Sequence, residues 1–304
     1  MKPKVIVIGG PTASGKSKLG IEIAKKIDGE IISADSMQIY KDMNIGTAKP
    51  SEEEKEGIIH HMLDFVLPNK RYSVSDFKKD AEEIIEKIIQ KGKTPIVVGG
   101  TGLYINSLIY NIEFPQIETD LEYRKELENI VEKEGLENLY NEACKIDKEA
   151  MEKISPNDRK RILRVLEIHK STGKTKTEQD KASRENEPIY DYKVFAIDFE
   201  REKLYDRINQ RVDIMLEMGL VEEVENLLNN YSEFPTAMQG LGYKEVREYL
   251  ENRATYEEMI ETLKMETRRY AKRQLTWFRK NEEIIWLKGE NKTEDNINII
   301  LSNL

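Results

Sequence analysis

The sequence predicts an α/β fold in which a core of parallel strands carries a helical insertion. Two observations favour the core: short apolar runs alternate with segments of helical periodicity, and a glycine-rich loop joins the first apolar run to the first helix. A third observation gives the insertion, because strand signals disappear between 116 and 191 and charged amphipathic patterns replace them. We therefore expect an α/β core with C-terminal helices formed by 1–115 and 192–304, and an insertion domain of helices at 116–191.

Five apolar runs are expected to form the strands of the core. They lie at 4–9, 30–34, 94–99, 193–198 and 283–287. Their nearly continuous apolar character is typical of parallel strands that are covered on both faces. The segment 73–92 is expected to be a helix because its apolar residues recur at helical spacing, and 201–280 is expected to be largely helical. His60 and His61 are expected on a helix in a structural role, pointing away from each other.

The loop after the first strand has the sequence Gly10-Pro11-Thr12-Ala13-Ser14-Gly15-Lys16-Ser17. It fits the phosphate-cradling pattern G-x-x-x-x-G-K-[ST], and it stands in the required order of strand, loop and helix. Backbone N–H groups and the helix N-terminus then point at one anion, Lys16 adds a positive charge, and the Ser17 hydroxyl is placed to ligate Mg²⁺. The core is therefore expected to be P-loop NTPase-like and to bind a polyphosphate with Mg²⁺ as cofactor.

The composition is that of a charged globular protein. Of 304 residues, 35% are charged and 38% are hydrophobic. Every apolar run is far too short to span a bilayer, and an apolar strand begins within the first few residues, where a signal peptide would lie. The single cysteine, Cys144, excludes an internal disulfide. These features predict a cytoplasmic protein with no membrane partner.

Positive charge is concentrated locally although the net charge is −9. Residues 268–280 contain six bases and no acid, and residues 156–176 contain seven bases and two acids. Local positive surfaces of this kind allow an acidic protein to follow a nucleic-acid backbone.

An acid and a glycine-rich run follow two of the expected strands. Asp35 comes directly after the run at 30–34, where it can serve as a metal ligand or as a general base. Gly99-Gly100-Thr101-Gly102 ends the third strand, and its glycines would let the backbone approach a ligand closely, with Thr101 as the functional side chain. Phosphate loops commonly belong to nucleotide hydrolases or small-molecule kinases, which hold Mg²⁺ with an acid after an apolar strand.

Eight runs stand in one order along the chain. They are Gly10-Pro-Thr-Ala-Ser-Gly-Lys-Ser17, Asp35-Ser-Met-Gln-Ile-Tyr40, Asn44-Ile-Gly-Thr-Ala-Lys-Pro50, Gly99-Gly-Thr-Gly-Leu-Tyr104, Asp158-Arg-Lys-Arg-Ile-Leu-Arg-Val-Leu-Glu167, Arg211-Val-Asp-Ile-Met-Leu216, Gly242-Tyr-Lys-Glu245 and Tyr270-Ala-Lys-Arg-Gln-Leu-Thr-Trp-Phe278. Together they closely resemble the tRNA dimethylallyltransferase family, from the N-terminus to about Phe278. The chain departs from the family at Gly240-Leu241-Gly242, where Ala-Ile-Gly is expected.

The resemblance implies an enzyme that transfers a dimethylallyl group from dimethylallyl diphosphate to N6 of the adenosine adjacent to the tRNA anticodon, releasing diphosphate. Asp35 is the candidate general base for the N6 proton. The phosphate loop with Lys16, Arg211 and Mg²⁺ held partly by Ser17 would stabilise the leaving diphosphate. Thr101 would bind either the diphosphate ester oxygen or the adenine. The sequence has no Asp-Asp pair, so the phosphate loop would replace the aspartate cluster of many prenyltransferases.

The resemblance also implies the anticodon stem-loop of tRNA as a partner. Asp35, Ser36, Met37, Gln38 and Thr101 are placed to read the extruded adenosine, and Gln38 offers both a donor and an acceptor. Candidates for contact with the stem lie in the insertion, at Arg124 and Arg159-Lys160-Arg161-Ile162-Leu163. A monomer is expected. Three alternatives stay open: an isopentenyltransferase acting on free adenine nucleotide, a P-loop small-molecule kinase, and a non-catalytic tRNA-binding module.

Overall fold

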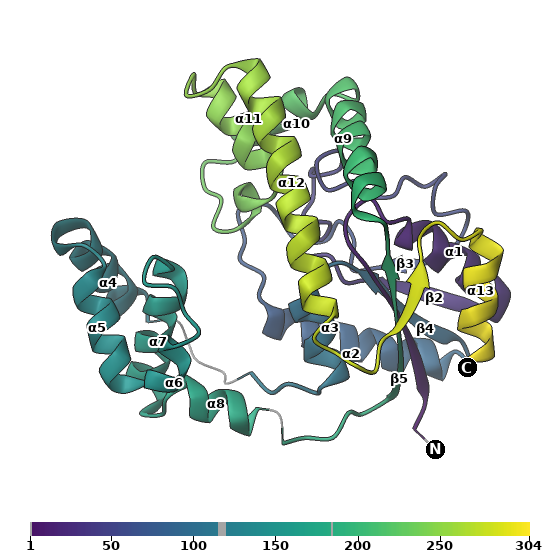
Figure 1. Cartoon of the computed structure of the whole chain (residues 1–304), viewed down its shortest axis with the longest axis horizontal. Coiled ribbons are helices and arrows are strands. Elements are labelled where there is room, and N and C mark those ends of the chain that lie inside the picture. The colour runs from purple at the N-terminus through teal and green to yellow at the C-terminus, as the bar shows by residue number, and fades with distance from the viewer. Residues whose placement is uncertain (1, 115–119, 184) are drawn as a thin grey trace. The chain divides into compact units, whose positions relative to one another are not determined.

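The structure, a computed structural model, describes residues 2–114, 120–183 and 185–304, and the chain forms two compact units (Figure 1). The first unit comprises Met1–Ile109 and Pro188–Leu304, and the second comprises Tyr110–Glu187. The expected start of the insertion at 116 lies outside the described residues. Its expected end at 191 is the first residue of a strand in the first unit.

The first unit is built on a six-stranded sheet in which all neighbouring strands are parallel. The strand order is β3-β2-β4-β1-β5-β6. The strands are β1 (Lys4–Gly9), β2 (Gly29–Ser33), β3 (His60–His61), β4 (Thr94–Gly99), β5 (Asp191–Asp198) and β6 (Ile285–Lys288). The five predicted strands are confirmed, and the parallel sheet with its central β1 confirms the predicted fold class.

The edge strand β3 corrects the expectation that His60 and His61 lie on a helix. Their backbone pairs with Ile31 and Ile32 of β2. The Nε2 atom of His61 lies 2.8 Å from Oε2 of the buried Glu30, so this histidine has a structural partner. Two residues are too few to show the alternating or apolar pattern by which a strand is recognised in a sequence.

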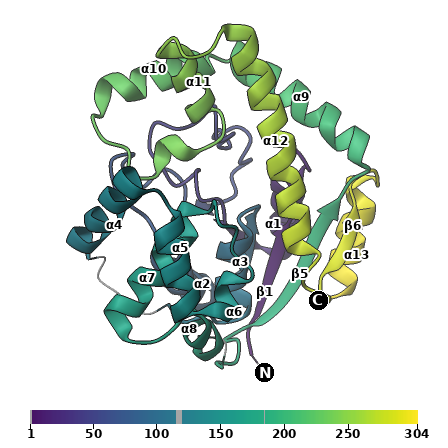
Figure 2. The same ribbon diagram turned by 60° about the vertical axis from the view of Figure 1, so that its left-hand side comes forward.

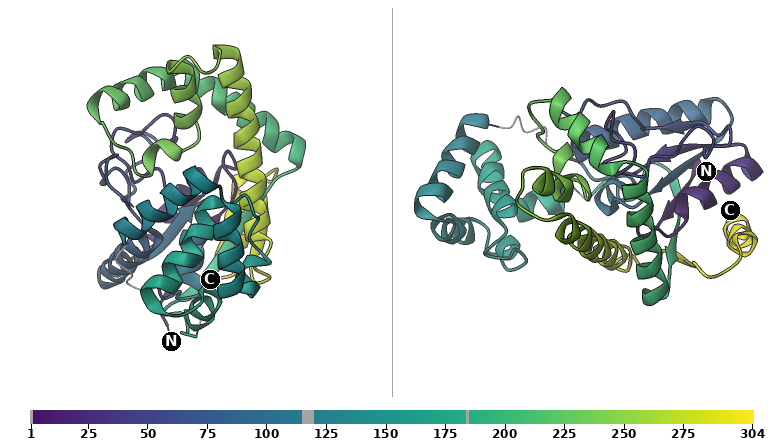
Figure 3. Two further views of the ribbon diagram at one scale, coloured as in Figure 1. Left: turned by 90° about the vertical axis from the view of Figure 1, so that its left-hand side faces the viewer. Right: turned by 90° about the horizontal axis from the view of Figure 1, so that it is seen from above.

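Alternate residues of β1 enter two apolar layers, one on each face of the sheet. Val5 and Val7 pack in the layer that contains α2 (Val74–Gln90) and α3 (Gly102–Ile109). Ile6 and Ile8 pack in the other layer, with α1 (Lys16–Ile27) and α13 (Thr293–Ser302). The view from above in Figure 3 shows α2 on one side of the sheet and α13 on the other. The layers confirm that the strands are covered on both faces.

A further group of helices follows β5 and has an apolar core of its own. Its members are α9 (Arg201–Glu217), α10 (Leu220–Asn230), the short η1 (Ala237–Gln239), α11 (Tyr243–Leu250) and α12 (Tyr256–Phe278). Ile39, Tyr40 and Met43 from the chain after β2 are fully buried in this core. Figure 2 shows α12 running from this group towards the sheet.

The second unit is helical, and its described residues 120–183 contain no strand. It consists of α4 (Leu121–Glu134), α5 (Glu137–Ile146), α6 (Lys148–Met151), α7 (Arg159–Thr172) and α8 (Lys176–Ala182). Leu127, Leu139, Ala143, Ile162 and Leu163 are among the buried residues of its separate core. Across the described residues of both units, no helix is long and apolar enough to cross a membrane.

Candidate active site

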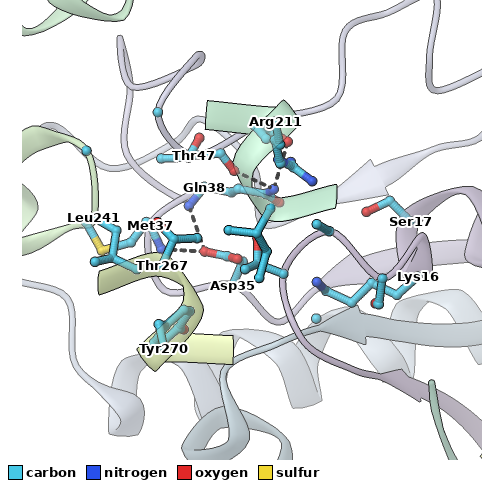
Figure 4. Close-up of a pocket in the computed structure, with 18 of the residues that line it drawn as sticks. Lys16, Ser17, Asp35, Met37, Gln38, Thr47, Arg211, Leu241, Thr267 and Tyr270 are labelled. Carbon is cyan, nitrogen blue, oxygen red and sulfur yellow. Dashed lines mark hydrogen bonds between the residues drawn. The ribbon is translucent and has the colours of Figure 1, made fainter. Parts of the chain in front are cut away.

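A cavity of about 720 Å³ lies in the first unit, lined at one edge by the ends of strands (Figure 4). The carboxyl ends of parallel strands meet at one edge of a sheet, so the loops after β1, β2 and β4 gather there. The wall of the cavity comes from the phosphate loop, the turn at 35–38, the loop at 46–48, α9, the segment 239–243 and α12.

The phosphate loop lines the cavity with Thr12 to Ser17, whereas Gly10 and Pro11 are buried and do not line it. Gly15 has φ of 85°, a left-handed conformation that favours glycine and turns the chain into α1. The Nζ atom of Lys16 donates to the carbonyl of Pro11 at 3.2 Å. Burial lowers the pKa of Lys16 to about 8; nearby Asp35 opposes this shift and Arg211 adds to it. A bound anion would stabilise the positive charge of this buried amine, so the site favours an anionic ligand.

Asp35 is oriented by its own turn. Its Oδ1 accepts hydrogen bonds from the backbone N–H groups of Met37 at 2.9 Å and Gln38 at 3.4 Å. Within the part of the chain that the structure describes, Oδ2 has no hydrogen-bond donor. The carboxylate thus has one oxygen that fixes its position and one that is available to a ligand in the cavity.

Thr101 supports this turn from the neighbouring strand. Its Oγ1 accepts the backbone N–H of Ser36 at 3.1 Å and donates to Ser36 Oγ at 3.4 Å. Ser36, Met37 and Gln38 line the cavity, whereas Thr101 does not. Direct contact of Thr101 with the diphosphate or the adenine stays a prediction.

The side-chain amide of Gln38 is already paired within the protein. Its Nε2 donates to the carbonyls of Thr47 at 3.1 Å and Ala48 at 3.2 Å, and its Oε1 accepts from Ser33 Oγ at 3.1 Å. Donation from this amide to a base would require one of the Nε2 bonds to break, whereas Oε1 keeps a second lone pair. In this structure Gln38 instead holds the loop at 46–48.

Two arginines of α9 face the cavity. Arg211, expected from the sequence, lies in its wall; burial lowers the pKa of Arg211, and Asp35 opposes that shift (Figure 4). Arg207 was not expected. Its Nε donates to the carbonyl of Ala13 at 2.8 Å, and its guanidinium lies over the ring of Phe199 at 5.1 Å. Neither arginine has an ion-pair partner among the described residues. A spacing of four residues on one helix face was the available signal for Arg207.

The glycines at 99–102 permit close packing, and the approach of this backbone to a ligand stays a prediction. A Cβ at Gly100 would collide with Nε2 of Gln274, and one at Gly102 would collide with the Trp277 ring. Gln274, buried on α12, donates from Nε2 to the Gly100 carbonyl at 2.9 Å and accepts the Thr12 N–H at 2.9 Å. The glycines therefore let α12 pack against the strand ends. Gln274 joins the phosphate loop after β1 to the loop after β4.

Apolar side chains complete the cavity. Val212 and Met215 come from α9, Leu263 from α12, and Leu241 from the segment before α11. Tyr270 of α12 also lines it, and burial together with the nearby Asp35 carboxylate raises the pKa of Tyr270. The cavity thus joins a polar, cationic side to an apolar side.

In the second unit, the side chains expected to contact tRNA divide into two sets. Ile162 and Leu163 are 0% exposed in the core of the unit, so their side chains are not offered to a ligand, and this part of the expectation is corrected. They are the apolar face of α7, whose N-terminal turn carries the exposed Lys160 and Arg161 and the half-buried Arg159. Arg124 is engaged by two acids, with Nη1 2.6 Å from Glu167 Oε1 and Nε 3.1 Å from Glu128 Oε1.

The oxygen donors of the phosphate loop fit a divalent cation that is shared with a phosphate. The Ser17 hydroxyl is exposed in the cavity, and the buried Ser14 Oγ makes no hydrogen bond to the described residues. No group of three acidic, histidine or cysteine side chains able to hold a metal occurs in the described ranges. A hard cation such as Mg²⁺, which keeps several waters and takes phosphate oxygens, suits such a sparse donor set.

The family model described as IPP transferase matches residues 38–281. This chain belongs to the IPP transferase family. The match begins at Gln38, after the phosphate loop and Asp35, and includes the loop at 46–48 and the helices α9 and α12 of the cavity wall.

Curated relatives in the IPP transferase family cover nearly the whole chain. The tRNA dimethylallyltransferase of Acetivibrio thermocellus is 54% identical over 292 residues, which are 96% of this chain and 93% of that protein. The tRNA dimethylallyltransferase of Caldanaerobacter subterraneus subsp. tengcongensis is 48% identical over 290 residues, 94% of this chain and 92% of that protein.

Solved structures of the family share the fold. The tRNA delta(2)-isopentenylpyrophosphate transferase of Staphylococcus epidermidis aligns with a TM-score of 0.73 at 44% identity and covers 99% of both chains. A eukaryotic dimethylallyltransferase, whose structure is described as acting on tRNA, aligns with a TM-score of 0.81 at 34% identity, over 99% of this chain and 80% of that chain. The likeness agrees with the predicted P-loop-like α/β core.

Proposed function

We propose that this chain transfers the dimethylallyl group of dimethylallyl diphosphate to N6 of the adenosine adjacent to the tRNA anticodon and releases diphosphate. Relatives at 54% and 48% identity over nearly the full length are named tRNA dimethylallyltransferases. They give no support to a small-molecule kinase, to a transferase acting on free nucleotide or to a non-catalytic binding module. The observation that carries the proposal is one cavity that combines a phosphate loop, an apolar wall and a carboxylate oxygen to which no described residue donates.

The phosphate loop would bind the diphosphate, which acts as leaving group. As the allylic C–O bond breaks, its electron pair leaves with the diphosphate, whose negative charge grows. Lys16, Arg207, Arg211 and the backbone N–H groups of the loop would surround that charge, and binding that strengthens as charge develops lowers the barrier. The buried hydroxyl of Ser14, which has no partner among the described residues, would be a further donor.

Asp35 would act as general base on the acceptor. The lone pair of N6 is delocalised into the adenine ring, so N6 is a weak nucleophile. As N6 forms its bond to the allylic carbon, one N6 proton would pass to Oδ2 of Asp35, the oxygen without a donor, and from there to solvent. Such positioned proton transfer accelerates a reaction by roughly 10²–10⁴-fold.

The apolar wall would receive the five-carbon group. Val212, Met215, Leu241 and Leu263 provide a surface for a hydrocarbon, and they exclude water that would otherwise capture the allylic cation character of the transition state. This division of one cavity into a cationic and an apolar part suits an allylic diphosphate better than a nucleoside triphosphate.

Mg²⁺ is proposed as the cofactor, with Ser17 as its protein ligand. The ion, when bound, would neutralise charge on the diphosphate. The other ligands would be phosphate oxygens and water, because Ser17 is the sole expected metal ligand of the loop.

The macromolecular partner would be the anticodon stem-loop of tRNA. Ser36 and Met37, which line the cavity beside Asp35, would contact the extruded adenosine, and Arg159, Lys160 and Arg161 would contact the stem backbone. We propose that the chain acts as a monomer in the cytoplasm.

The direct test is incubation of the purified chain with an anticodon stem-loop RNA and radiolabelled dimethylallyl diphosphate. Label should enter the RNA, with one diphosphate released for each group transferred, and an RNA with guanosine at the target position should stay unlabelled. Preferential labelling of AMP would support the free-nucleotide transferase instead. Absence of label from every acceptor would refute the proposed function.

A further inference from the structure

The carboxylate of Glu223 is bound by a loop that is distant from it in sequence. One oxygen accepts the backbone N–H groups of Asn44 and Ile45, both at 2.8 Å, and the other accepts the N–H of Gly46 at 3.1 Å. The second oxygen also accepts the hydroxyl of Tyr243 at 2.7 Å. Three consecutive N–H groups form an anion-binding concavity, and here a side chain of the protein itself fills it.

The ring of Tyr243 packs against Gly46, and its hydroxyl donates to Glu223. It is fully buried, and a Cβ at Gly46 would lie 2.6 Å from Cε2 of the tyrosine ring, so only glycine permits this packing. Burial and the Glu223 carboxylate raise the pKa of Tyr243, so the phenol stays a donor to that carboxylate. The segment Asn44 to Gly46 is thereby fixed by α10 and α11 together.

The bound loop continues directly into the wall of the cavity. Gly46, Thr47 and Ala48 line it, and the carbonyls of Thr47 and Ala48 accept hydrogen bonds from the Gln38 side chain. The backbone N–H of Gln38 in turn donates to Oδ1 of Asp35. Figure 4 shows Gln38 and Thr47 on one side of Asp35, with Lys16 and Ser17 on the other. Hydrogen bonds and the short stretch of backbone at 46–48 therefore link Glu223 to Asp35 through Gln38.

Comparison with its neighbour Glu222 shows that Glu223 does more than stabilise the start of α10. Glu222 and Glu223 both lie in the first turn of α10, where negative charge favours the helix. Glu222 is exposed, whereas both oxygens of Glu223 are directed to the 44–46 segment. The two neighbours share the effect on the helix, but only Glu223 holds the loop.

We infer that Glu223 is a positioning residue for the proposed transfer reaction: it holds the wall at 46–48 and, through Gln38, the turn that carries Asp35. The inference rests on the proposed function. Glu223 does not touch the reactants, so its effect should fall on the alignment of acceptor and base, while binding of the diphosphate by the phosphate loop is unaffected.

Glu223→Gln is the primary variant. The amide retains one acceptor oxygen but turns an NH₂ group towards backbone N–H donors, so the loop loses its anchor. We expect kcat with the stem-loop RNA to fall at least tenfold while KM for dimethylallyl diphosphate stays within threefold. Glu222→Gln is the matched control, since it removes the same charge from the same helical turn, and it should keep wild-type kcat. Equal kcat for both variants would overturn the inference.

A double-mutant cycle with Gln38→Ala tests the route. If Glu223 and Gln38 act through the same loop, the double variant should be no more than about threefold worse in kcat than the worse single variant. If the fold losses of kcat in the two single variants multiply in the double variant, the shared route is wrong. Tyr243→Phe, which removes one of four donors and keeps the ring over Gly46, provides a milder variant should Glu223→Gln fold poorly, and a threefold or smaller loss of kcat with unchanged KM is expected.

Hydrogen exchange separates failure of this inference from failure of the proposed function. In Glu223→Gln, without any substrate, the amides of Asn44, Ile45 and Gly46 should exchange at least tenfold faster than in Glu222→Gln. Unchanged exchange would overturn the positioning role even if the wild-type chain prenylates RNA. Faster exchange in a protein that prenylates nothing would refute the proposed function and leave the loop anchor intact.

Discussion

Oε1 of Gln274 accepts a hydrogen bond from the backbone N–H of Thr12 at 2.9 Å, across 262 positions of sequence. The same amide donates to Gly100, so one buried side chain on α12 determines the spacing between the phosphate loop and the loop after β4. Both loops surround the cavity, and the geometry of the diphosphate site therefore depends on a helix near the end of the chain.

Replacement of Gln274 by Met should destabilise the protein. Methionine fills a similar volume but leaves the Gly100 carbonyl and the Thr12 N–H without these partners, at a cost of about 1–3 kcal/mol for the buried carbonyl and less for the half-buried N–H. We expect a clear decrease in the free energy of unfolding by urea titration. Lys272→Met, an exposed position on the same helix, should be nearly neutral in that measurement. Equal stability of the two variants would contradict the bridging role.

Replacement of Asp35 by Asn should remove the base while preserving the turn. An Asn oxygen can still accept from Met37 and Gln38, but the amide cannot take up a proton. Single-turnover prenylation of RNA should slow by roughly 10²–10⁴-fold, with RNA affinity within about threefold of wild type. Asp42→Asn, an exposed acid on the same loop, is the control. A near-normal rate for Asp35→Asn would exclude the general-base role.

Diphosphate affinity should decrease above about pH 8. The pKa of Lys16 in the free protein is about 8, and a bound anion favours the charged amine and raises that pKa. Below pH 8 the amine is already protonated and its contribution is constant. Above pH 8 binding must take up a proton, so affinity should fall by up to about tenfold per pH unit.

Calorimetric titration of inorganic diphosphate between pH 7 and 9.5 measures this dependence. In Lys16→Met the affinity should be weak throughout, and the decrease above pH 8 should be absent. If the variant shows the same pH dependence as the wild type, another group is responsible for it.

Arg207→Met should weaken binding of dimethylallyl diphosphate and leave RNA binding unchanged. The guanidinium is tied to the phosphate loop through Ala13 and lacks an acidic partner among the described residues. We expect KM for dimethylallyl diphosphate to rise about tenfold or more, because a charge-assisted hydrogen bond contributes roughly 1.5–3 kcal/mol. Arg201→Met, at the start of the same helix with its guanidinium over Tyr205, is the matched control. Unaltered KM would remove Arg207 from the site.

Reversal of charge at Arg159 and Arg161 should weaken RNA binding. Glutamate at these positions suits the N-terminal turn of α7, so the unit should remain folded. The slope of log Kd against log salt should become shallower by about 0.7–0.9 for each RNA phosphate that the protein no longer neutralises. A double reversal at Lys145 and Lys153, exposed in the same unit, changes the net charge equally and should leave the slope intact. Identical slopes for both doubles would contradict this RNA surface.

Local sequence patterns predicted most of the core and part of the site. The strands were recognised because continuous apolar runs are required where both faces are covered, and the phosphate loop and Asp35 because each directly follows a strand. Gln274, Arg207 and Glu223 were not predicted, since each acts on backbone that is distant in sequence. The packing of α12 on the glycines at 99–102 was not predicted for the same reason: a glycine accommodates a ligand and a helix equally well, and only the structure shows Gln274 and Trp277 against Gly100 and Gly102.

The two ends of the second unit lie side by side. The N–H of Glu113 donates to the carbonyl of Ser183 at 3.1 Å, and Asn111 Nδ2 donates to the carbonyl of Glu187 at 2.9 Å. An inserted domain whose two ends lie close together can be gained, lost or replaced in evolution without altering the strand order of the sheet that carries it. Selection can therefore act on the RNA surface that we propose for this unit separately from the residues around the leaving group, and the two properties can diverge at different rates.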